Sequence, residues 1–309
     1  MRVVFLGTPD FAELPLVKIS ENYEVVGVVT QQDKRQGRKN ILTPPPVKER
    51  ALSLGLPVYQ FDKISKEGVE TLKSLNPDIM VTCAYGQILT QEIIDIPRLG
   101  IYNIHASLLP KYRGASPIQS AIKMGEKETG VTIMKTDIGL DTGDILLQER
   151  IEIGQNETAG ELFERLSVLG ADAIVKALKI IESGNFTLVK QDDSKASYFS
   201  TLKKQDGVID FNKNSSEIHA FVRAMSPWPS AYAFLNGETF KLFSPKIVEN
   251  LSGVPGEILV ADKNGLVVAT KDSAILFDEI QAPTQKRMSV KDYLLGHKLS
   301  VGDLFKGLE

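Results

Sequence analysis

Residues 78–85, DIMVTCAY, form a nearly continuous apolar run, and this run decides the fold class. A strand covered on both faces of a parallel sheet has this composition. The next run, GIYNIHAS at 100–107, alternates between polar and apolar residues. Because strand side chains repeat every two residues, Asn103, His105 and Ser107 share one face. Polar groups on an interior strand are costly unless they are hydrogen-bonded or used by a site, so this face is the first candidate for chemistry.

The first half of the chain repeats the order strand then helix. The other apolar runs followed by helical periodicity are VVFLG at 3–7, EVVGVVT at 24–30 and PVYQ at 57–60. This order predicts an α/β fold with a Rossmann-like parallel sheet and crossover helices. Further strands are expected at 130–137 and 143–153. Thr158 and Glu161 have the spacing of a capping box, which predicts the start of a long helix.

The pattern changes after Gly184. The following residues are polar and have no sustained period, which is typical of a linker. A short helix near 215–225 comes next, and then short strands with the hairpin signal Asn-Gly at 236–237 and 264–265. These features predict a small OB-like β-barrel. The predicted division of the chain is a first domain at 1–186, a linker at 187–205 and a barrel domain at 206–309.

Composition and charge narrow the class of protein. The chain has 309 residues, 42% of them hydrophobic, and a net charge of −3, so it is not a uniformly basic nucleic-acid binder. No apolar run approaches the roughly 20 residues of a membrane span, which predicts a cytoplasmic protein without a membrane partner. Cys83 is the only cysteine and lies within an apolar run, which favours a buried structural thiol. We also expect a monomer.

The glycine-framed loop DIGLDTGD at 137–144 supplies a partner for the polar strand. In a proton transfer, a carboxylate at Asp141 could fix the tautomer of His105 and support its charged form. The amide of Asn103 could donate to a developing oxyanion. Taken singly, a strand histidine is more often a core residue and an Asp between glycines a turn residue, but their conjunction favours acyl transfer to an amine.

The sequence also bears on whether the site contains a protein nucleophile or a metal ion. No serine or cysteine has an obvious nucleophilic position, which favours direct attack by the substrate. The three histidines, His105, His219 and His297, are far apart in sequence, so we expect no metal.

Two segments resemble a known family. NIHASLLPKYRGASPIQ at 103–119 and DIGLDTGDIL at 137–146 are similar to the signature of the folate-dependent formyltransferases. GTPDFA at 7–12 and VTQQDKRQGRK at 29–39 resemble the members of that family that act on methionyl-tRNA. The resemblance extends over nearly the whole chain.

The resemblance implies an activity and the residues that carry it. It implies transfer of a formyl group from 10-formyltetrahydrofolate to the α-amine of methionine on initiator tRNA. The residues implied as catalytic are Asn103, His105 and Asp141. Those implied as folate contacts are Ser107, Leu108, Leu109 and Pro110 of the S-L-L-P segment, and Gly86, Gln87, Ile88 and Leu89 at the end of the neighbouring strand.

The loop QQDKRQGRKN at 31–40 is implied as a tRNA contact. Taken alone, this charge run indicates only a solvated surface. Within the family, a similar loop enters the acceptor stem, where phosphates supply affinity and Arg38 could reach base edges. This sequence departs from the family pattern at Gln32, where proline is common, and at Lys39, where a second glycine is common. The loop residues implied in tRNA binding are Lys34, Arg35, Arg38 and Lys39.

The net charge of the C-terminal part does not by itself indicate a nucleic-acid-binding surface. Residues 206–309 contain 11 Lys or Arg and 13 Asp or Glu, a net of −2, so only a local basic patch is possible. The candidate tRNA contacts are Lys203, Lys204, Lys286 and Arg287, for which scattered solvated side chains are an equal alternative. For Trp228, between two prolines, we favour a core position at a barrel corner over a base-stacking platform.

Two other functions remain open at this point. A folate-dependent formyltransferase acting on an amino sugar would share the catalytic residues and the S-L-L-P segment. A nucleotide-dependent oxidoreductase is the alternative from another class. Its glycine turn, GTPDFA, lacks the G-x-G-x-x-G spacing that lets a pyrophosphate approach a helix N-terminus.

Overall fold

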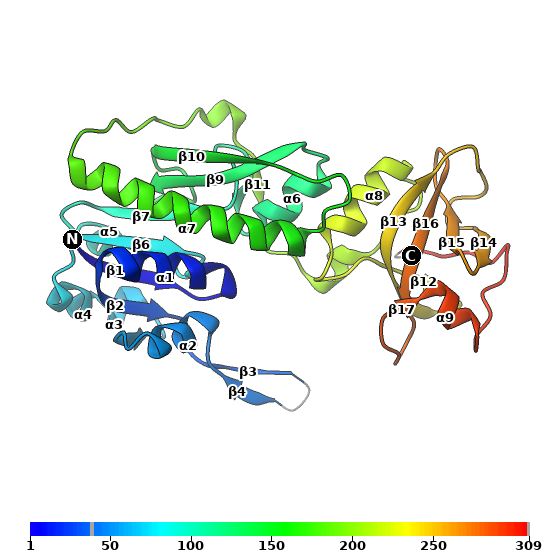
Figure 1. Cartoon of the computed structure of the whole chain (residues 1–309), viewed down its shortest axis with the longest axis horizontal. Helices are drawn as coiled ribbons and strands as arrows, with labels where there is room; N and C mark the ends of the chain where they lie inside the picture. Colours follow the sequence, from blue (N-terminus) through cyan, green and yellow to red (C-terminus); the bar gives the residue numbers. More distant parts are fainter. Residues whose placement is uncertain (38–39, 308–309) are drawn as a thin grey trace. The chain divides into compact units, whose positions relative to one another are not determined.

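The computed structural model describes residues 1–37 and 40–307 and divides into two compact units (Figure 1). The first unit comprises residues 1–117, 128–152 and 163–199, and the second comprises 118–127, 153–162 and 200–309. Neither unit is therefore a single stretch of sequence. In the described part of the chain, no helix is long and apolar enough to cross a membrane.

The first unit is built on a seven-stranded sheet in the order β10-β9-β7-β6-β1-β2-β5. Its strands are β1 Arg2–Gly7, β2 Glu24–Thr30, β5 Val58–Gln60, β6 Ile79–Cys83, β7 Ile101–His105, β9 Glu128–Lys135 and β10 Ile145–Glu152. Five neighbouring strands of this sheet, β7, β6, β1, β2 and β5, are parallel, as predicted. The prediction of a parallel sheet is wrong at the other edge, where β9 runs antiparallel to both β7 and β10. Residues 118–127 pack in the second unit instead of crossing this sheet, so β9 starts beside the carboxyl end of β7.

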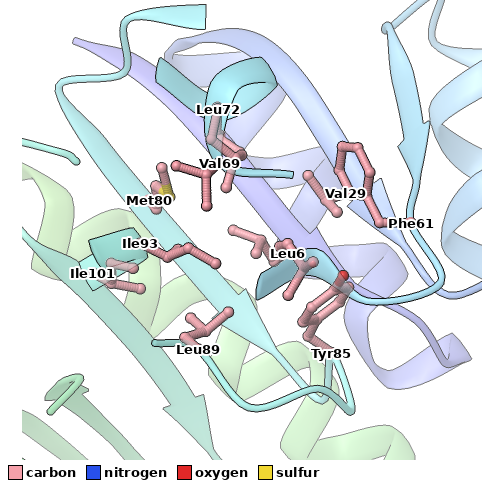
Figure 2. Packing of buried hydrophobic residues seen from close by; sticks show 12 residues of the cluster. Leu6, Val29, Phe61, Val69, Leu72, Met80, Tyr85, Leu89, Ile93 and Ile101 are labelled. Atoms are coloured by element: carbon pink, nitrogen blue, oxygen red, sulfur yellow. The ribbon is translucent and has the colours of Figure 1, made fainter. Parts of the chain in front are cut away.

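A cluster of buried hydrophobic residues covers one face of the sheet (Figure 2). Ile101 of β7 packs there with Met80 and with Leu72 and Ile93 from two helices on this face. The helices of this unit are α1 Glu13–Asn22, α2 Pro46–Ser53, α3 Ile64–Glu67, α4 Val69–Leu75, α5 Gln91–Ile94 and most of α7 Ala159–Ser183, with a 3-10 turn η1 at Asp10–Ala12. Because side chains alternate along β7, Asn103 and His105 project from the same face as Ile101.

The opposite face of the sheet lies against α7. A Cβ added at Gly170 of this helix would lie 3.0 Å from Ile104 of β7, so the helix backbone packs close to the strand. The predicted capping box at its start is confirmed: Thr158 N–H donates to Glu161 Oε2 at 2.8 Å, and Glu161 N–H donates to Thr158 Oγ1 at 3.3 Å. The bond from the Thr158 N–H, and secondly one from the Thr158 hydroxyl, hold the pKa of the Glu161 carboxyl below its ordinary value.

Two short strand pairs complete the first unit. β3 Lys34–Gln36 and β4 Ile41–Thr43 form an antiparallel hairpin. β8 Arg113–Gly114 and β11 Tyr198–Phe199 pair in parallel, with a 3-10 turn η2 at Asp193–Lys195 before β11. The segment predicted as a linker thus contributes a strand and specific contacts to the first unit.

The second unit contains an antiparallel sheet in the order β12-β13-β16-β15-β14, with β17 paired to β16. Its further elements are α6 Pro117–Lys123, η3 Lys204–Gly207, α8 Ser215–Ala224, β12 Tyr232–Leu235, β13 Glu238–Val248, β14 Ile258–Asp262, β15 Gly265–Ala269, β16 Ala274–Gln281, β17 Met288–Ser289 and α9 Val290–Leu294. Both predicted Asn-Gly hairpins are confirmed, and the first has positive φ at Asn236 and Gly237, 52° and 81°.

Two predictions about single side chains have opposite outcomes. Cys83 is fully buried in β6, as predicted, and burial raises the pKa of its thiol. The core position predicted for Trp228 is wrong, since its side chain is 54% exposed. This residue lies between Pro227 and Pro229 in the connection from α8 to β12, where neither helix nor strand turns it inward.

Candidate active site

The amide of Asn103 is oriented by the neighbouring strand. Thr82 of β6 is its register partner, and the Thr82 hydroxyl donates to Asn103 Oδ1 at 2.9 Å. The carbonyl end of the amide is thereby held against the sheet. Among the described residues, the Nδ2 end has no acceptor, so it is the donor available to a substrate oxygen.

The tautomer of His105 is fixed by a backbone carbonyl. The imidazole is 5% exposed, and its Nε2 lies 2.9 Å from the carbonyl oxygen of Tyr112. A carbonyl oxygen can only accept, so Nε2 carries the proton and donates it. Tyr112 itself has a positive φ of 62°, which turns its peptide group in this way. The other nitrogen, Nδ1, is left as the atom that can take up a proton.

The Asp141 carboxylate lies beside that nitrogen. Its Oδ2 is 3.7 Å from His105 Nδ1 and accepts a hydrogen bond of 2.7 Å from the backbone N–H of Gly114. The loop that carries it leaves β9 beside the start of β7, and its carboxylate reaches His105 at the end of that strand. The structure thus brings Asp141 against His105, on the strand face that also carries Asn103.

Internal contacts shape this loop. Asp137 Oδ1 accepts from the N–H of Gly139 at 3.1 Å and from Thr142 Oγ1 at 2.7 Å. A Cβ at Gly143 would collide with the carbonyl oxygen of Lys135. Asp141 has a φ of 54°, a left-handed conformation that costs a residue with a side chain about 1 kcal/mol or more. Because of the close approach of the Lys135 carbonyl, position 143 must be a glycine.

The S-L-L-P segment is held by two polar side chains from the antiparallel edge of the sheet. Thr132 of β9 donates to the carbonyl of Ser107 at 2.6 Å and accepts from the N–H of Leu109 at 3.1 Å. Gln148 of β10 donates to the carbonyl of Leu109 at 2.8 Å and to Thr132 Oγ1 at 2.9 Å. Neither residue was predicted from the sequence, although a threonine inside the apolar run GVTIM is a recognisable signal for Thr132.

The candidate folate contacts differ in exposure. The Ser107 side chain is fully buried and donates to the carbonyl of Lys111 at 2.8 Å, and Leu109 is also buried. Leu108 and Pro110 are partly exposed. Leu108 and Pro110 are therefore the side chains of the turn that a ligand can reach.

The candidate folate contacts in the segment after β6 also differ in exposure. Gln87 is tied to the start of α3, since its Oε1 accepts from the N–H of Ile64 at 2.8 Å, and Leu89 lies in the buried cluster. Gly86 has a φ of 87°, which favours glycine. Ile88 is 84% exposed and is the large apolar surface of this segment. Burial raises the pKa of Tyr85, which precedes Gly86, to about 12.

The candidate tRNA contacts are exposed where the structure describes them. Lys34 and Arg35 lie on the β3–β4 hairpin, and Arg35 Nη1 donates to the carbonyl of Asn40 at 3.0 Å. Arg38 and Lys39 lie outside the described residues. Lys203, Lys204 and Lys286 are exposed in the second unit.

Arg287, the remaining candidate, already has partners. It forms an ion pair with Glu279 and lies 4.2 Å from the centre of the Phe243 ring. Its charge is therefore partly compensated before any phosphate approaches.

Family models match both parts of the chain. A formyl transferase model matches residues 1–178, and a formyl transferase C-terminal domain model matches residues 201–298. A methionyl-tRNA formyltransferase of Clostridioides difficile is 46% identical over 305 residues, which cover 98% of this chain and 99% of the relative. The chain belongs to the methionyl-tRNA formyltransferase family. A relative in Alkaliphilus metalliredigens is also 46% identical, over 98% of each chain. The predicted family, and with it the class of enzyme, a transferase, is confirmed.

Solved structures show the same fold at lower identity. An N-formyltransferase from Helicobacter canadensis, solved with folinic acid and dTDP-3-aminofucose, has a TM-score of 0.70 at 21% identity, covering 93% of this chain and 99% of its own. A methionyl-tRNA formyltransferase from Clostridium thermocellum has a TM-score of 0.56 at 16% identity, covering 91% and 98%. The family therefore shares its fold with enzymes that formylate other amines.

In the part of the chain that the structure describes, no three His, Cys, Asp or Glu side chains are grouped so that they could hold a metal ion.

Proposed function

We propose that this protein transfers the formyl group of 10-formyltetrahydrofolate to the α-amino group of methionyl initiator tRNA, with Asn103, His105 and Asp141 as its catalytic residues. The observation that carries the proposal is the arrangement at His105. Its Nε2 proton is committed to the Tyr112 carbonyl, and its Nδ1 lies 3.7 Å from the Asp141 carboxylate. A nitrogen that can take up a proton, with an anion behind it, is what attack by an amine requires.

The attacking amine must first be neutral. A free α-amino group has a pKa of about 7.7–8.0, and an ester neighbour should lower it, so much of the substrate is already neutral near pH 7.5. A bond then forms between the amine nitrogen and the formyl carbon, and the carbonyl electron pair moves to the formyl oxygen. Asn103 Nδ2 donates to this developing oxyanion, while Thr82 keeps the amide turned toward it.

His105 moves the proton. As the new carbon–nitrogen bond forms, Nδ1 accepts the proton that the amine loses, and Asp141 stabilises the resulting positive charge. When the oxyanion collapses, the bond between the formyl carbon and the folate nitrogen breaks. Nδ1 returns its proton to that nitrogen, so the protein ends the cycle unchanged and tetrahydrofolate leaves.

The folate is assigned to the turn at 107–110 and to the segment at 84–89. Ile88 is 84% exposed there, and Ile138 and Leu140 of the Asp141 loop are 66% and 62% exposed. Exposed apolar side chains beside a polar site fit a flat pterin ring that also needs a few hydrogen bonds. Because Ser107 and Leu109 are buried and their carbonyls accept from Thr132 and Gln148, these two residues fix the shape of the turn.

The tRNA is assigned to the β3–β4 hairpin and to a barrel domain. We infer that the sheet of the second unit closes as an OB-like barrel and that its exposed lysines follow the phosphate backbone, as the hairpin's Lys34 and Arg35 do. Because all three catalytic side chains come from one chain, a monomer suffices, and we place the enzyme in the cytoplasm.

A single assay tests the proposed function. The protein is incubated with 10-formyltetrahydrofolate and either methionyl initiator tRNA or a nucleotide-linked amino sugar, and the formylated product is measured. We expect formylmethionyl-tRNA and no formylated sugar. Formylation of the sugar without formylation of the tRNA would reject the proposal in favour of the amino-sugar alternative.

A further inference from the structure

The carbonyls of the Asp141 loop are held by a buried side chain from the segment after α7. Gln191 is 6% exposed, and its Nε2 donates to the carbonyl of Asp141 at 2.9 Å and to the carbonyl of Gly143 at 2.7 Å. Both acceptors lie on the loop that carries the catalytic carboxylate. A single amide thus fixes two points of the loop, one on each side of Thr142.

The other end of the same amide is held by a buried guanidinium. Gln191 Oε1 accepts from Arg113 Nε at 3.1 Å and from Nη2 at 2.8 Å, and the Arg113 side chain is 1% exposed. Arg113 also donates to Asp193 Oδ1 at 2.7 Å and to the Tyr198 hydroxyl at 2.6 Å. Carbonyls only accept hydrogen bonds and a guanidinium only donates them. The loop carbonyls at one end and Arg113 at the other therefore require the same orientation of the Gln191 amide.

The strand that contains Arg113, β8, also contacts the Asp141 carboxylate. Arg113 precedes Gly114, whose backbone N–H donates to Asp141 Oδ2. β8, formed by these two residues, is paired with β11, and a Cβ at Gly114 would collide with the carbonyl of Phe199. Asp141 is therefore held at its carboxylate through Gly114 and at its backbone through Gln191.

We propose that Gln191, oriented by Arg113, is a positioning residue that keeps the Asp141 carboxylate against His105 during the reaction. The left-handed φ of Asp141 is unfavourable by itself, so contacts from outside the loop must maintain it. A displacement of about 1 Å of a catalytic group can reduce turnover by about 100-fold. The inference rests on the catalytic role proposed for Asp141.

The decisive variant is Gln191→Glu, which keeps the length of the side chain and an acceptor for Arg113 but removes the two donated hydrogen bonds. We expect kcat to fall by about 10- to 100-fold while the KM values for the folate and the tRNA stay within about twofold. Gln191→Met, of similar length and without a donor, should behave in the same way and replaces the Glu variant if that protein does not fold. Lys190→Ala, a change at the exposed neighbouring position, is the control and should keep the wild-type kcat.

A double-mutant cycle with Asp141→Asn separates positioning from general damage. If Gln191 acts through the carboxylate, Gln191→Glu should cost far less in the Asp141→Asn background than in the wild type. An equal loss in both backgrounds, or a rise in KM in place of a fall in kcat, would overturn the inference. Wild-type turnover of Asp141→Asn alone would instead reject the catalytic role of Asp141, so the two failures are distinguishable.

Discussion

The Nε2 atom of His105 donates its proton to the carbonyl oxygen of Tyr112 across 2.9 Å, which commits this nitrogen and leaves Nδ1 for chemistry. Because only one nitrogen can serve as a base, we expect His105→Asn to reduce kcat by about 100- to 10,000-fold, the usual contribution of a general base. Single-turnover formylation of methionyl-tRNA checks this. His297→Asn, which changes an exposed histidine of the second unit, is the control and should retain activity. Near-normal turnover by His105→Asn would contradict the assignment.

Thr82→Val should act on the Asn103 amide. The substitution keeps the shape of the side chain and removes the hydroxyl that donates to Asn103 Oδ1. The amide is then free to rotate, so we expect kcat to fall by about 10-fold with KM unchanged. The matched control is Thr30→Val, because Thr30 is buried in β2 and its hydroxyl has no partner among the described residues. Equal kcat values for the two variants would show that Thr82 does not orient the amide.

Lys48 anchors the base of the β3–β4 hairpin. Its Nζ donates to Asp33 Oδ1 at 2.8 Å and to Gln60 Oε1 at 2.8 Å. The hydrogen bond from Lys48, and secondly that from Gln60, hold the pKa of the Asp33 carboxyl below its ordinary value. We expect Lys48→Met to loosen the hairpin and raise the KM for tRNA several-fold, with little change in the KM for folate. Steady-state kinetics with each substrate varied in turn measure both.

A control for Lys48→Met lies on the same helix. Arg50 pairs with Glu13 and makes no described contact with the hairpin, so Arg50→Met should leave the KM for tRNA unchanged. If both variants raised that KM equally, the effect would be due to lost positive charge, and the anchoring role of Lys48 would be wrong.

His219 makes the stability of the second unit depend on pH. Burial, and secondly the charge of Arg223, lower its pKa from 6.5 to about 4. The unfolded chain therefore binds a proton at a higher pH than the folded one, and the free energy of unfolding should fall as pH drops from about 6.5 to about 4. Above this window the full stability is present, and the loss across it is on the order of 3 kcal/mol. Urea unfolding at pH 7.5 and 5.0, for the wild type and His219→Gln, measures the part of this loss that falls between the two pH values.

The Gln variant at position 219 is the reference for that prediction, because glutamine does not titrate in this range. Its free energy of unfolding should change less than that of the wild type between the two pH values. An identical pH dependence in both proteins would mean that other groups cause the loss.

The period of two along residues 101–107 predicted the polar face of β7, because alternation is a local property of a strand. The glycines around Asp141 predicted a tight loop for a similar reason. The reversed direction of β9 could not be predicted this way, since it depends on where residues 118–127 pack. The position of Gln191 was equally hidden, because a polar segment without period looks the same whether it is solvated or folded onto a loop.

The contacts of Gln191 also have a consequence for synthesis on the ribosome, where the chain emerges from its N-terminus. His105 and Asp141 are synthesised first, but the amide that holds the Asp141 loop comes 50 residues later, and β11, which pairs with β8, follows at Tyr198–Phe199. A nascent chain of only the first 186 residues contains the three proposed catalytic side chains and lacks Gln191, which we propose to align Asp141. If the proposal is correct, we expect activity only when the translation product extends past Phe199.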